Sequence, residues 1–202
     1  MISRPDREQA AERARLTIMG ISVFVIDAER TFADALAVRL EAEEDVEVVA
    51  SLHPRVPAPS LIVGRHADVV LLDADLTDNA AIRLCEELSS RAEAPRVVML
   101  SHGSDPKWIA DAVRAGAAAW VGKNESLEHL LTVVRGVAAG ETWLPPAQTG
   151  AVVRLLLAGR EQQEESCRLL AALTPREREV LTCLAEGAGR RDVAERLHLS
   201  FR

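Results

Sequence analysis

Short apolar runs alternate with longer amphipathic segments over roughly the first two thirds of the chain. The apolar runs are rich in valine, leucine and isoleucine, and several of them stop at a polar residue. Uninterrupted apolar runs of this length are typical of strands buried on both faces of a parallel sheet. They predict five strands, over residues 21–26, 46–50, 69–73, 96–101 and 118–121.

The amphipathic segments predict the helices that connect these strands. Phe32, Leu36 and Leu40 recur at four-residue spacing, and Ser126 stands where it can cap a helix rich in leucine and valine. The remaining segments predict a loop with a short helix over 53–66 and helices over 80–91 and 108–115. Alternation of strands and helices predicts an α/β fold: a doubly wound, five-stranded parallel sheet with right-handed crossovers.

The pattern changes after residue 146. Residues 151–170 form a charge-rich amphipathic segment, typical of a linker helix or a dimer-contact helix. Thr174, Pro175 and Glu177 then spell a capping box with proline at the first helical position. A second short helix is expected over 191–197. The predicted organisation is an N-terminal extension (1–18), an α/β domain (19–143), a linker helix (144–169) and a partial all-α domain (170–202).

Composition and charge narrow the function. The net charge of −7 argues against a protein that coats nucleic acid along its whole length, although a small local DNA reader remains compatible with it. No apolar run is long enough to span a bilayer, and the N-terminus is too charged for a signal peptide. Three scattered cysteines form no metal-ligand pattern and no disulfide framework. A cytoplasmic protein without membrane attachment is therefore expected.

Four polar residues fall at the ends of successive predicted strands: Asp27, Asp73, Ser101 and Lys123. The carboxyl ends of parallel strands share one edge of the sheet, which is where α/β folds bind ligands. Two carboxylates held together favour a cation between them, and Mg²⁺ is commonly bound by few carboxylates plus waters. An aspartate can also accept a phosphoryl group, with a lysine and a hydroxyl holding the phosphoryl oxygens. Each residue alone is also compatible with an ordinary solvated strand end or a helix cap.

Five segments, taken in order, resemble those of a known family. They are VID at 25–27, DVVLLD at 68–73, VVMLS at 97–101, AGAAAWVGK at 115–123 and LTPREREVL at 173–181. The first part resembles a receiver domain, which has a flavodoxin-like fold. The whole chain resembles a two-component response regulator of the NarL/FixJ class, with a LuxR-type helix-turn-helix output domain.

The resemblance implies roles for the residues at the strand ends. Asp73 would be the phosphoacceptor, supplied by a sensor histidine kinase; Ser101 would be the switch hydroxyl and Lys123 the phosphate-binding lysine. Trp120 would be the aromatic switch residue, although it is equally compatible with a place in the core. Asp27 and Asp73 would bind Mg²⁺, together with the backbone carbonyl of Asp75. The alternative for Asp75 is a residue that is merely solvated.

The sequence also departs from the family pattern. The usual second acid after the first strand is Ala28, which places Mg²⁺ binding in question. Glu29 could reach the metal instead, but the sequence favours a solvated residue at the start of a helix. The usual proline four residues after the phosphoacceptor is Thr77, and the usual Asp-Gly pair is Ala80–Ala81. These changes in the loop after the phosphoacceptor suggest that phosphorylation is weak or dispensable.

The output end predicts weak DNA binding by this chain. In a helix-turn-helix the second helix of the motif reads the major groove, and the sequence reaches Arg202 where that recognition helix should begin. Six arginines against five acids over 170–202 leave little charge for phosphate contacts. Either the output domain is truncated or a shortened one serves another use; a complete one would bind promoter DNA.

Three functions compete on this reading. The first is a DNA-binding transcriptional regulator, not an enzyme, in which phosphorylation of Asp73 controls homodimerisation and DNA binding. The second is an atypical, phosphorylation-independent receiver that acts as a protein-interaction and dimerisation module; Ala28 and Thr77 favour it. The third, a metabolic enzyme, is disfavoured because no glycine-rich phosphate loop follows the first strand.

Overall fold

The computed structural model describes residues 20–53, 66–186 and 189–197. Its contacts divide the chain into two units, Met1–Leu155 and Leu156–Arg202, which are described separately. The N-terminal extension, most of the predicted segment at 53–66 and the last five residues lie outside the described part.

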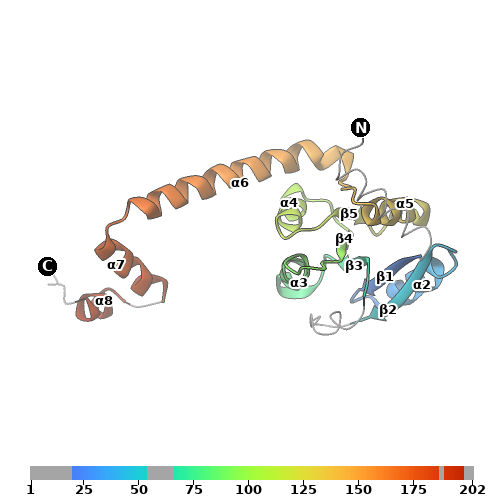
Figure 1. Cartoon of the computed structure of the whole chain (residues 1–202), viewed down its shortest axis with the longest axis horizontal. Coiled ribbons are helices and arrows are strands. Elements are labelled where there is room, and N and C mark those ends of the chain that lie inside the picture. The colour runs from blue at the N-terminus through green and yellow to red at the C-terminus, as the bar shows by residue number, and fades with distance from the viewer. Residues whose placement is uncertain (1–19, 54–65, 187–188, 198–202) are drawn as a thin grey trace. The chain divides into compact units, whose positions relative to one another are not determined.

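The first unit contains the predicted five-stranded parallel sheet (Figure 1). The strand order is β2-β1-β3-β4-β5, which confirms a doubly wound, flavodoxin-like arrangement. Strand β2 is longer at its end than predicted, and β5 is displaced by one residue. The bounds are β1 Ile21–Ile26, β2 Val46–Leu52, β3 Val69–Asp73, β4 Arg96–Ser101 and β5 Ala119–Gly122.

Helices cover both faces of the sheet (Figure 1). On one face, α2 and α5 pack on the core cluster; the other face carries α3 and α4. Ser126 caps α5 as predicted, with its hydroxyl accepting from the backbone N–H of His129 at 3.2 Å. The bounds are α2 Arg30–Leu40, a 3₁₀ turn η2 Thr77–Asn79, α3 Ala80–Ser89, α4 Pro106–Arg114 and α5 Leu127–Ala138.

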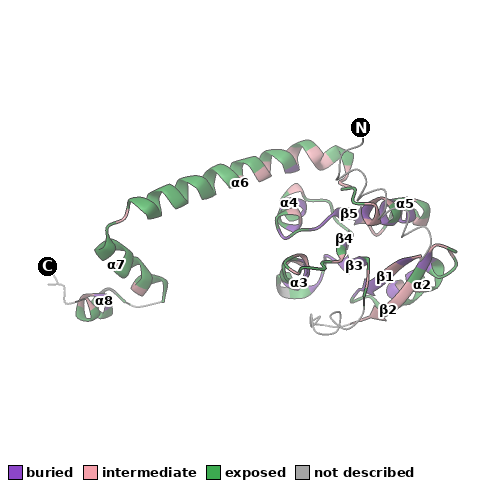
Figure 2. Cartoon of the chain, viewed as in Figure 1, coloured by how far each residue is buried: buried purple, intermediate pink, exposed green. Residues whose placement is uncertain are grey.

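The central strands are buried on both faces (Figure 2). Successive side chains of a strand point to opposite faces of the sheet. Val25 and Leu71 therefore join the cluster under α2 and α5, whereas Phe24 and Leu72 point to the opposite face. All four are completely buried. This burial explains why the sequence shows continuous apolar runs, and it fixes the positions of the polar residues at the strand ends.

Gly116 and Gly140 both adopt positive φ after a helix, at +96° and +90°. A Cβ at Gly116 would lie 2.4 Å from both Cβ and Oγ of Ser89, whereas at Gly140 the nearest atom is an Arg96 Nη2 at 3.8 Å. We expect Gly116→Ala to lower the free energy of unfolding by about 3 kcal/mol, because left-handed strain and overpacking add. Gly140→Ala should cost only about 1 kcal/mol of strain. Equal urea-denaturation losses for the two variants would contradict this.

The C-terminal helices are α6 Pro146–Ala172, α7 Pro175–Ala185 and α8 Arg190–Arg196. The helix predicted over 151–170 therefore begins earlier and ends slightly later. The capping box is confirmed: the Thr174 backbone N–H donates to Glu177 at 2.8 Å, and the Glu177 N–H donates to the Thr174 hydroxyl.

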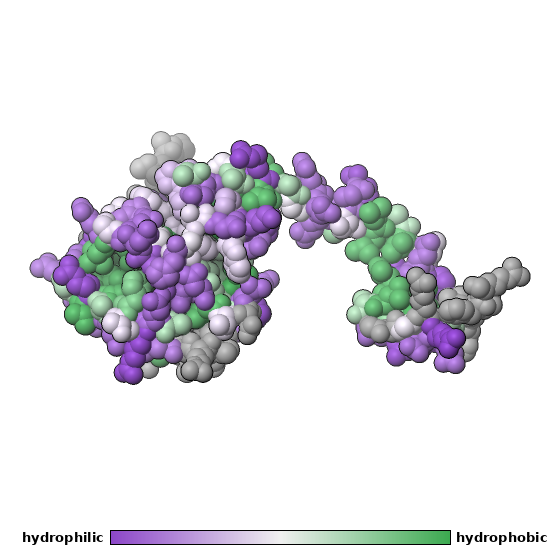
Figure 3. All heavy atoms as spheres, turned by 180° about the vertical axis from the view of Figure 1, so that it is seen from behind, coloured by the Kyte–Doolittle hydropathy of each residue, from purple (hydrophilic) through white to green (hydrophobic). Residues whose placement is uncertain are grey.

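Few side chains of the second unit are buried (Figure 2). Val193 is buried, but the leucines Leu181 and Leu184 of α7 are 43% and 46% exposed. Hydrophobic groups therefore reach the surface of this unit (Figure 3).

Candidate functional site

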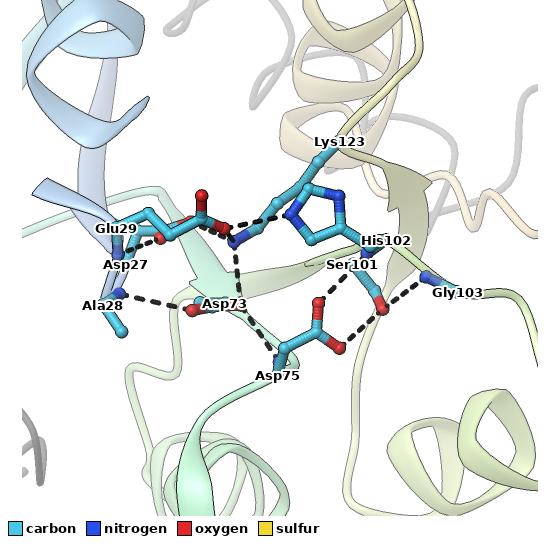
Figure 4. A network of polar contacts seen from close by, with 9 residues as sticks. All are labelled: Asp27, Ala28, Glu29, Asp73, Asp75, Ser101, His102, Gly103 and Lys123. Carbon is cyan, nitrogen blue, oxygen red and sulfur yellow. Dashed lines mark hydrogen bonds and ion pairs between the residues drawn. The ribbon is translucent and has the colours of Figure 1, made fainter. Parts of the chain in front are cut away.

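The four strand-end residues lie together at the carboxyl edge of the sheet (Figure 4). Asp27 directly follows β1, and Asp73 ends β3, the strand beside it. The chain order of the strands reverses at this point, which is where a doubly wound sheet leaves a crevice. Ser101 ends β4 and Lys123 follows β5, so the sheet itself brings the predicted residues to one edge.

Lys123 is the centre of the charged cluster. Its Nζ lies 2.9 Å from Asp27 Oδ2, 3.0 Å from Asp73 Oδ1 and 3.0 Å from Glu29 Oε1. The Lys123 and Asp27 side chains are fully buried, and that of Asp73 is only 3% exposed. Lys123 is held from its backbone as well, since its N–H donates to the Ser101 carbonyl at 2.8 Å. The ammonium thus neutralises carboxylates that would otherwise repel each other in a dry environment.

The cluster shifts two ionisation equilibria. Burial raises the pKa of Asp27, an effect that hydrogen bonds from Lys123 and from the Glu29 backbone oppose. Burial alone would lower the pKa of Lys123, but its hydrogen bonds to Asp27, Glu29 and Asp73 outweigh burial and raise that pKa. Lys123 therefore remains a cation at every physiological pH, as a phosphoryl-binding group must.

Glu29 is an exposed residue at the start of α2, as the sequence favours, and it also reaches the cluster. Its side chain is 54% exposed, yet Oε1 contacts both Lys123 Nζ and His102 Nε2 at 3.0 Å. These contacts lower the pKa of Glu29, the hydrogen bond with His102 first. Glu29 and His102 thus link the start of α2 with the loop after β4 beside the buried Asp73 (Figure 4).

Asp75 makes contacts that the sequence did not indicate. Its carboxylate accepts the Ser101 hydroxyl at 2.9 Å and the His102 backbone N–H at 3.0 Å. Its own N–H donates to Asp73 Oδ1 at 3.0 Å. The Asp75 side chain is therefore not merely solvated, and it accepts the hydrogen bond that the Ser101 hydroxyl donates.

Trp120 is buried, with 5% of its surface exposed, and its indole Nε1–H donates to the Gly103 carbonyl at 3.1 Å. Gly103 in turn donates its N–H to Ser101 Oγ at 3.0 Å. The side chain fills core space, as one of the two readings expects, and it also ties the loop after β4 to β5.

The oxygen atoms at this edge of the sheet are of the type that a hard divalent ion prefers. Asp27 and Asp73 present buried carboxylates at one point, where the Lys123 ammonium now contacts both. Within the described ranges no cluster of three or more acidic, histidine or cysteine side chains is arranged to hold a metal. Mg²⁺, however, is commonly bound by only one or two carboxylates plus waters. The residues therefore fit Mg²⁺, with fewer carboxylates than a site completed by an acid at position 28.

The fold and the site define a class. A five-stranded doubly wound sheet with an aspartate pair, a hydroxyl and a lysine at its carboxyl edge is the arrangement of a receiver domain. Comparison with known families agrees, since residues 23–135 match the response regulator receiver domain. Residues 171–202 match the luxR family of bacterial regulatory proteins.

Known proteins resemble the chain over most of its length. The DNA-binding transcriptional activator DevR/DosR of Mycobacterium tuberculosis is 29% identical over 180 residues, covering 89% of this chain and 81% of that protein. The response regulator ChrA of a heme-sensing two-component system has a crystal structure with 26% identity and a TM-score of 0.51, covering 90% and 83%. The receiver domain of the NarL protein from M. tuberculosis, at 23% identity and a TM-score of 0.53, covers 58% and 98%.

The chain belongs to the response regulators. It joins a receiver to a LuxR-type DNA-binding domain, the organisation of a two-component transcriptional regulator. The alternative of an interaction module that is independent of phosphorylation is not favoured by these matches. Among the described residues, no helix has the length and apolar character needed to cross a membrane.

Proposed function

We propose that this response regulator is switched by phosphorylation of Asp73. A carboxylate oxygen of Asp73 attacks phosphorus, the bond from phosphorus to the donor's imidazole nitrogen or oxygen breaks, and the leaving atom keeps the electron pair. The product is an acyl phosphate on the protein itself, so the step is self-modification and not turnover of a substrate. The observation that carries this proposal is the buried Lys123 ammonium, 3.0 Å from Asp73 and 2.9 Å from Asp27.

The surrounding residues support the transfer in different ways. Lys123 supplies a fixed positive charge for a phosphoryl oxygen, and Ser101 supplies a hydroxyl donor at the end of the adjacent strand. Mg²⁺, when bound, would neutralise negative charge on the phosphoryl group. The Asp27 and Asp73 carboxylates and the Asp75 backbone carbonyl would hold the ion. Glu29, an exposed acid whose carboxylate contacts Lys123, would take the place of the missing acid at position 28.

We further propose how the signal enters and leaves. A sensor histidine kinase supplies the phosphoryl group in the cytoplasm, and the modified receiver changes homodimerisation and thereby promoter binding by the LuxR-type domain. Trp120 supports this route as the switch aromatic, because its indole bond to Gly103 connects β5 with the loop that follows Ser101. Six arginines against five acids over residues 170–202 support only weak DNA affinity of that stretch by itself.

Phosphorylation from a small donor tests the proposal. We expect the protein, incubated with Mg²⁺ and acetyl phosphate, to gain the mass of one phosphoryl group, as measured on the intact protein. Asp73→Asn should abolish the gain, because an amide is not a nucleophile here while its size is conserved. Asp68→Asn is the matched control, since Asp68 lies just before the opposite end of the same strand and pairs with Ser22. No gain in the unmodified sequence, or a gain that persists in Asp73→Asn, would contradict the proposal.

A further inference from the structure

The Asp75 carboxylate occupies two hydrogen-bond donors beside the phosphoacceptor. It accepts from the Ser101 hydroxyl at 2.9 Å and from the His102 backbone N–H at 3.0 Å (Figure 4). A serine hydroxyl has a single proton to donate. Ser101 therefore cannot donate to Asp75 and to a phosphoryl oxygen on Asp73 at the same time.

Electrostatic repulsion also opposes the simultaneous presence of the Asp75 carboxylate and a phosphoryl group beside Ser101. A phosphoryl group brings between one and two negative charges and three acceptor oxygens. Asp75 lies next to Asp73, since its own N–H donates to the Asp73 carboxylate at 3.0 Å. The Asp75 carboxylate therefore places a negative charge close to the position of the phosphoryl group. The two anions would repel each other and require the same donors, so one has to leave when the other arrives.

The contacts of Asp75 extend into the loop after β4. Ser101 Oγ, which donates to Asp75, accepts the N–H of Gly103, and the Gly103 carbonyl accepts the indole N–H of Trp120. A continuous series of hydrogen bonds thus runs from Asp75 to Trp120. The series connects the Asp75 carboxylate with Trp120 of β5 through the loop that follows β4.

We infer that Asp75 is a positioning residue: its carboxylate holds Ser101 and the loop after β4 in the unphosphorylated protein and must release them before a phosphoryl group on Asp73 can take those donors. The inference rests on the proposed function, since it concerns the same reaction at Asp73. It has two consequences. Transfer to Asp73 is slowed by Asp75, and the unphosphorylated loop already has an anion where the phosphoryl group would place one.

The test compares labelling rates of the full chain with acetyl phosphate and Mg²⁺. We expect Asp75→Ala to be phosphorylated about tenfold faster than the unmodified sequence. In this variant the charge-assisted hydrogen bond from Ser101 to Asp75 no longer has to break before transfer. Asp75→Asn, which keeps an acceptor but loses the charge, should fall between them. Asp68→Ala is the matched control: it also removes a carboxylate that accepts from a serine hydroxyl and a backbone N–H, and should leave the rate unchanged.

The indole N–H resonance of Trp120, assigned through Trp120→Phe, supplies a second readout. In unphosphorylated Asp75→Ala it should shift from its position in the unmodified protein, and phosphorylation should return it. A merely structural role of Asp75 would instead slow labelling and leave the resonance displaced. Circular dichroism of both Asp75 variants confirms that they fold.

The outcomes separate this inference from the proposed function. Labelling of both proteins at equal rates, or slower labelling of Asp75→Ala, overturns the role of Asp75 and leaves the proposed function standing. Labelling of Asp75→Ala alone, lost in the double variant with Asp73→Asn, supports the role of Asp75 and overturns phosphorylation of the native sequence. Labelling of neither protein overturns both.

Discussion

Replacing Lys123 with methionine is expected to lower the free energy of unfolding at neutral pH by about 3 kcal/mol. Methionine fills a similar volume but leaves Asp27 and Asp73, both almost fully buried, without the ammonium that lies 2.9 and 3.0 Å from them. Removing one partner of a buried ion pair costs this much because the remaining charge stays desolvated and uncompensated. Urea denaturation followed by circular dichroism measures the loss.

The loss should shrink as the pH is lowered. In the variant the pKa of Asp27 rises further, since burial and the charge of Asp73 still raise it while the hydrogen bond to Lys123 no longer lowers it. A group whose pKa is higher in the folded state contributes stability below its unfolded pKa and loses that contribution as the pH rises through the folded value. The destabilisation of the variant relative to the unmodified protein should therefore decrease as the pH is lowered from neutral to mildly acidic values.

The chain offers a close control for this substitution. Lys107, the only other lysine of the sequence, is exposed near the start of α4. Lys107→Met should change the free energy of unfolding by less than about 0.5 kcal/mol at either pH. A Lys123→Met variant as stable as Lys107→Met at pH 7 would show that the buried carboxylates do not need the ammonium.

Hydrophobic periodicity was sufficient to predict the sheet and the edge at which the polar residues meet. The first, third and fourth strands have the predicted bounds, because a run buried on both faces has to be apolar throughout and the change to polar residues marks its end. Strand β2 extends to Leu52, past the predicted end, because it pairs with β1 along its whole length. Pairing across strands is a property of the sheet that no local pattern reports.

The choice of side-chain partners could not be predicted in the same way. Spacing placed Ser101 and Asp73 at neighbouring strand ends, but the hydroxyl of Ser101 donates to Asp75, two residues farther along. Likewise Glu29 reads as a solvated residue that begins a helix, and its half-exposed side chain nevertheless reaches Lys123. Several acceptors lie within reach of each donor, so the outcome depends on distances of a few ångströms that only the folded chain fixes.

Replacing Ala28 with aspartate is expected to strengthen Mg²⁺ binding at least tenfold. Ala28 follows Asp27 directly, it is exposed, and its backbone N–H donates to Asp73 Oδ2 at 3.2 Å. A carboxylate at this position adds a hard oxygen ligand beside the two that Asp27 and Asp73 already present. A tenfold change corresponds to about 1.4 kcal/mol of binding free energy, which one additional charged ligand can supply. Isothermal titration with MgCl₂ measures the affinity directly.

Two further variants decide whether the gain comes from ligation. Ala28→Asn adds a side chain of the same size without the charge, and it should strengthen Mg²⁺ binding far less. Glu29→Gln in the Ala28→Asp background should cost little, whereas in the native sequence it should weaken Mg²⁺ binding, because Glu29 there would substitute for the missing acid. Equal Mg²⁺ affinities of Ala28→Asp and the unmodified protein would mean that position 28 lies too far from the ion. In that case the absent acid would not explain any weakness of phosphorylation, and the contacts of Asp75 with Ser101 and His102 would be the feature that limits it.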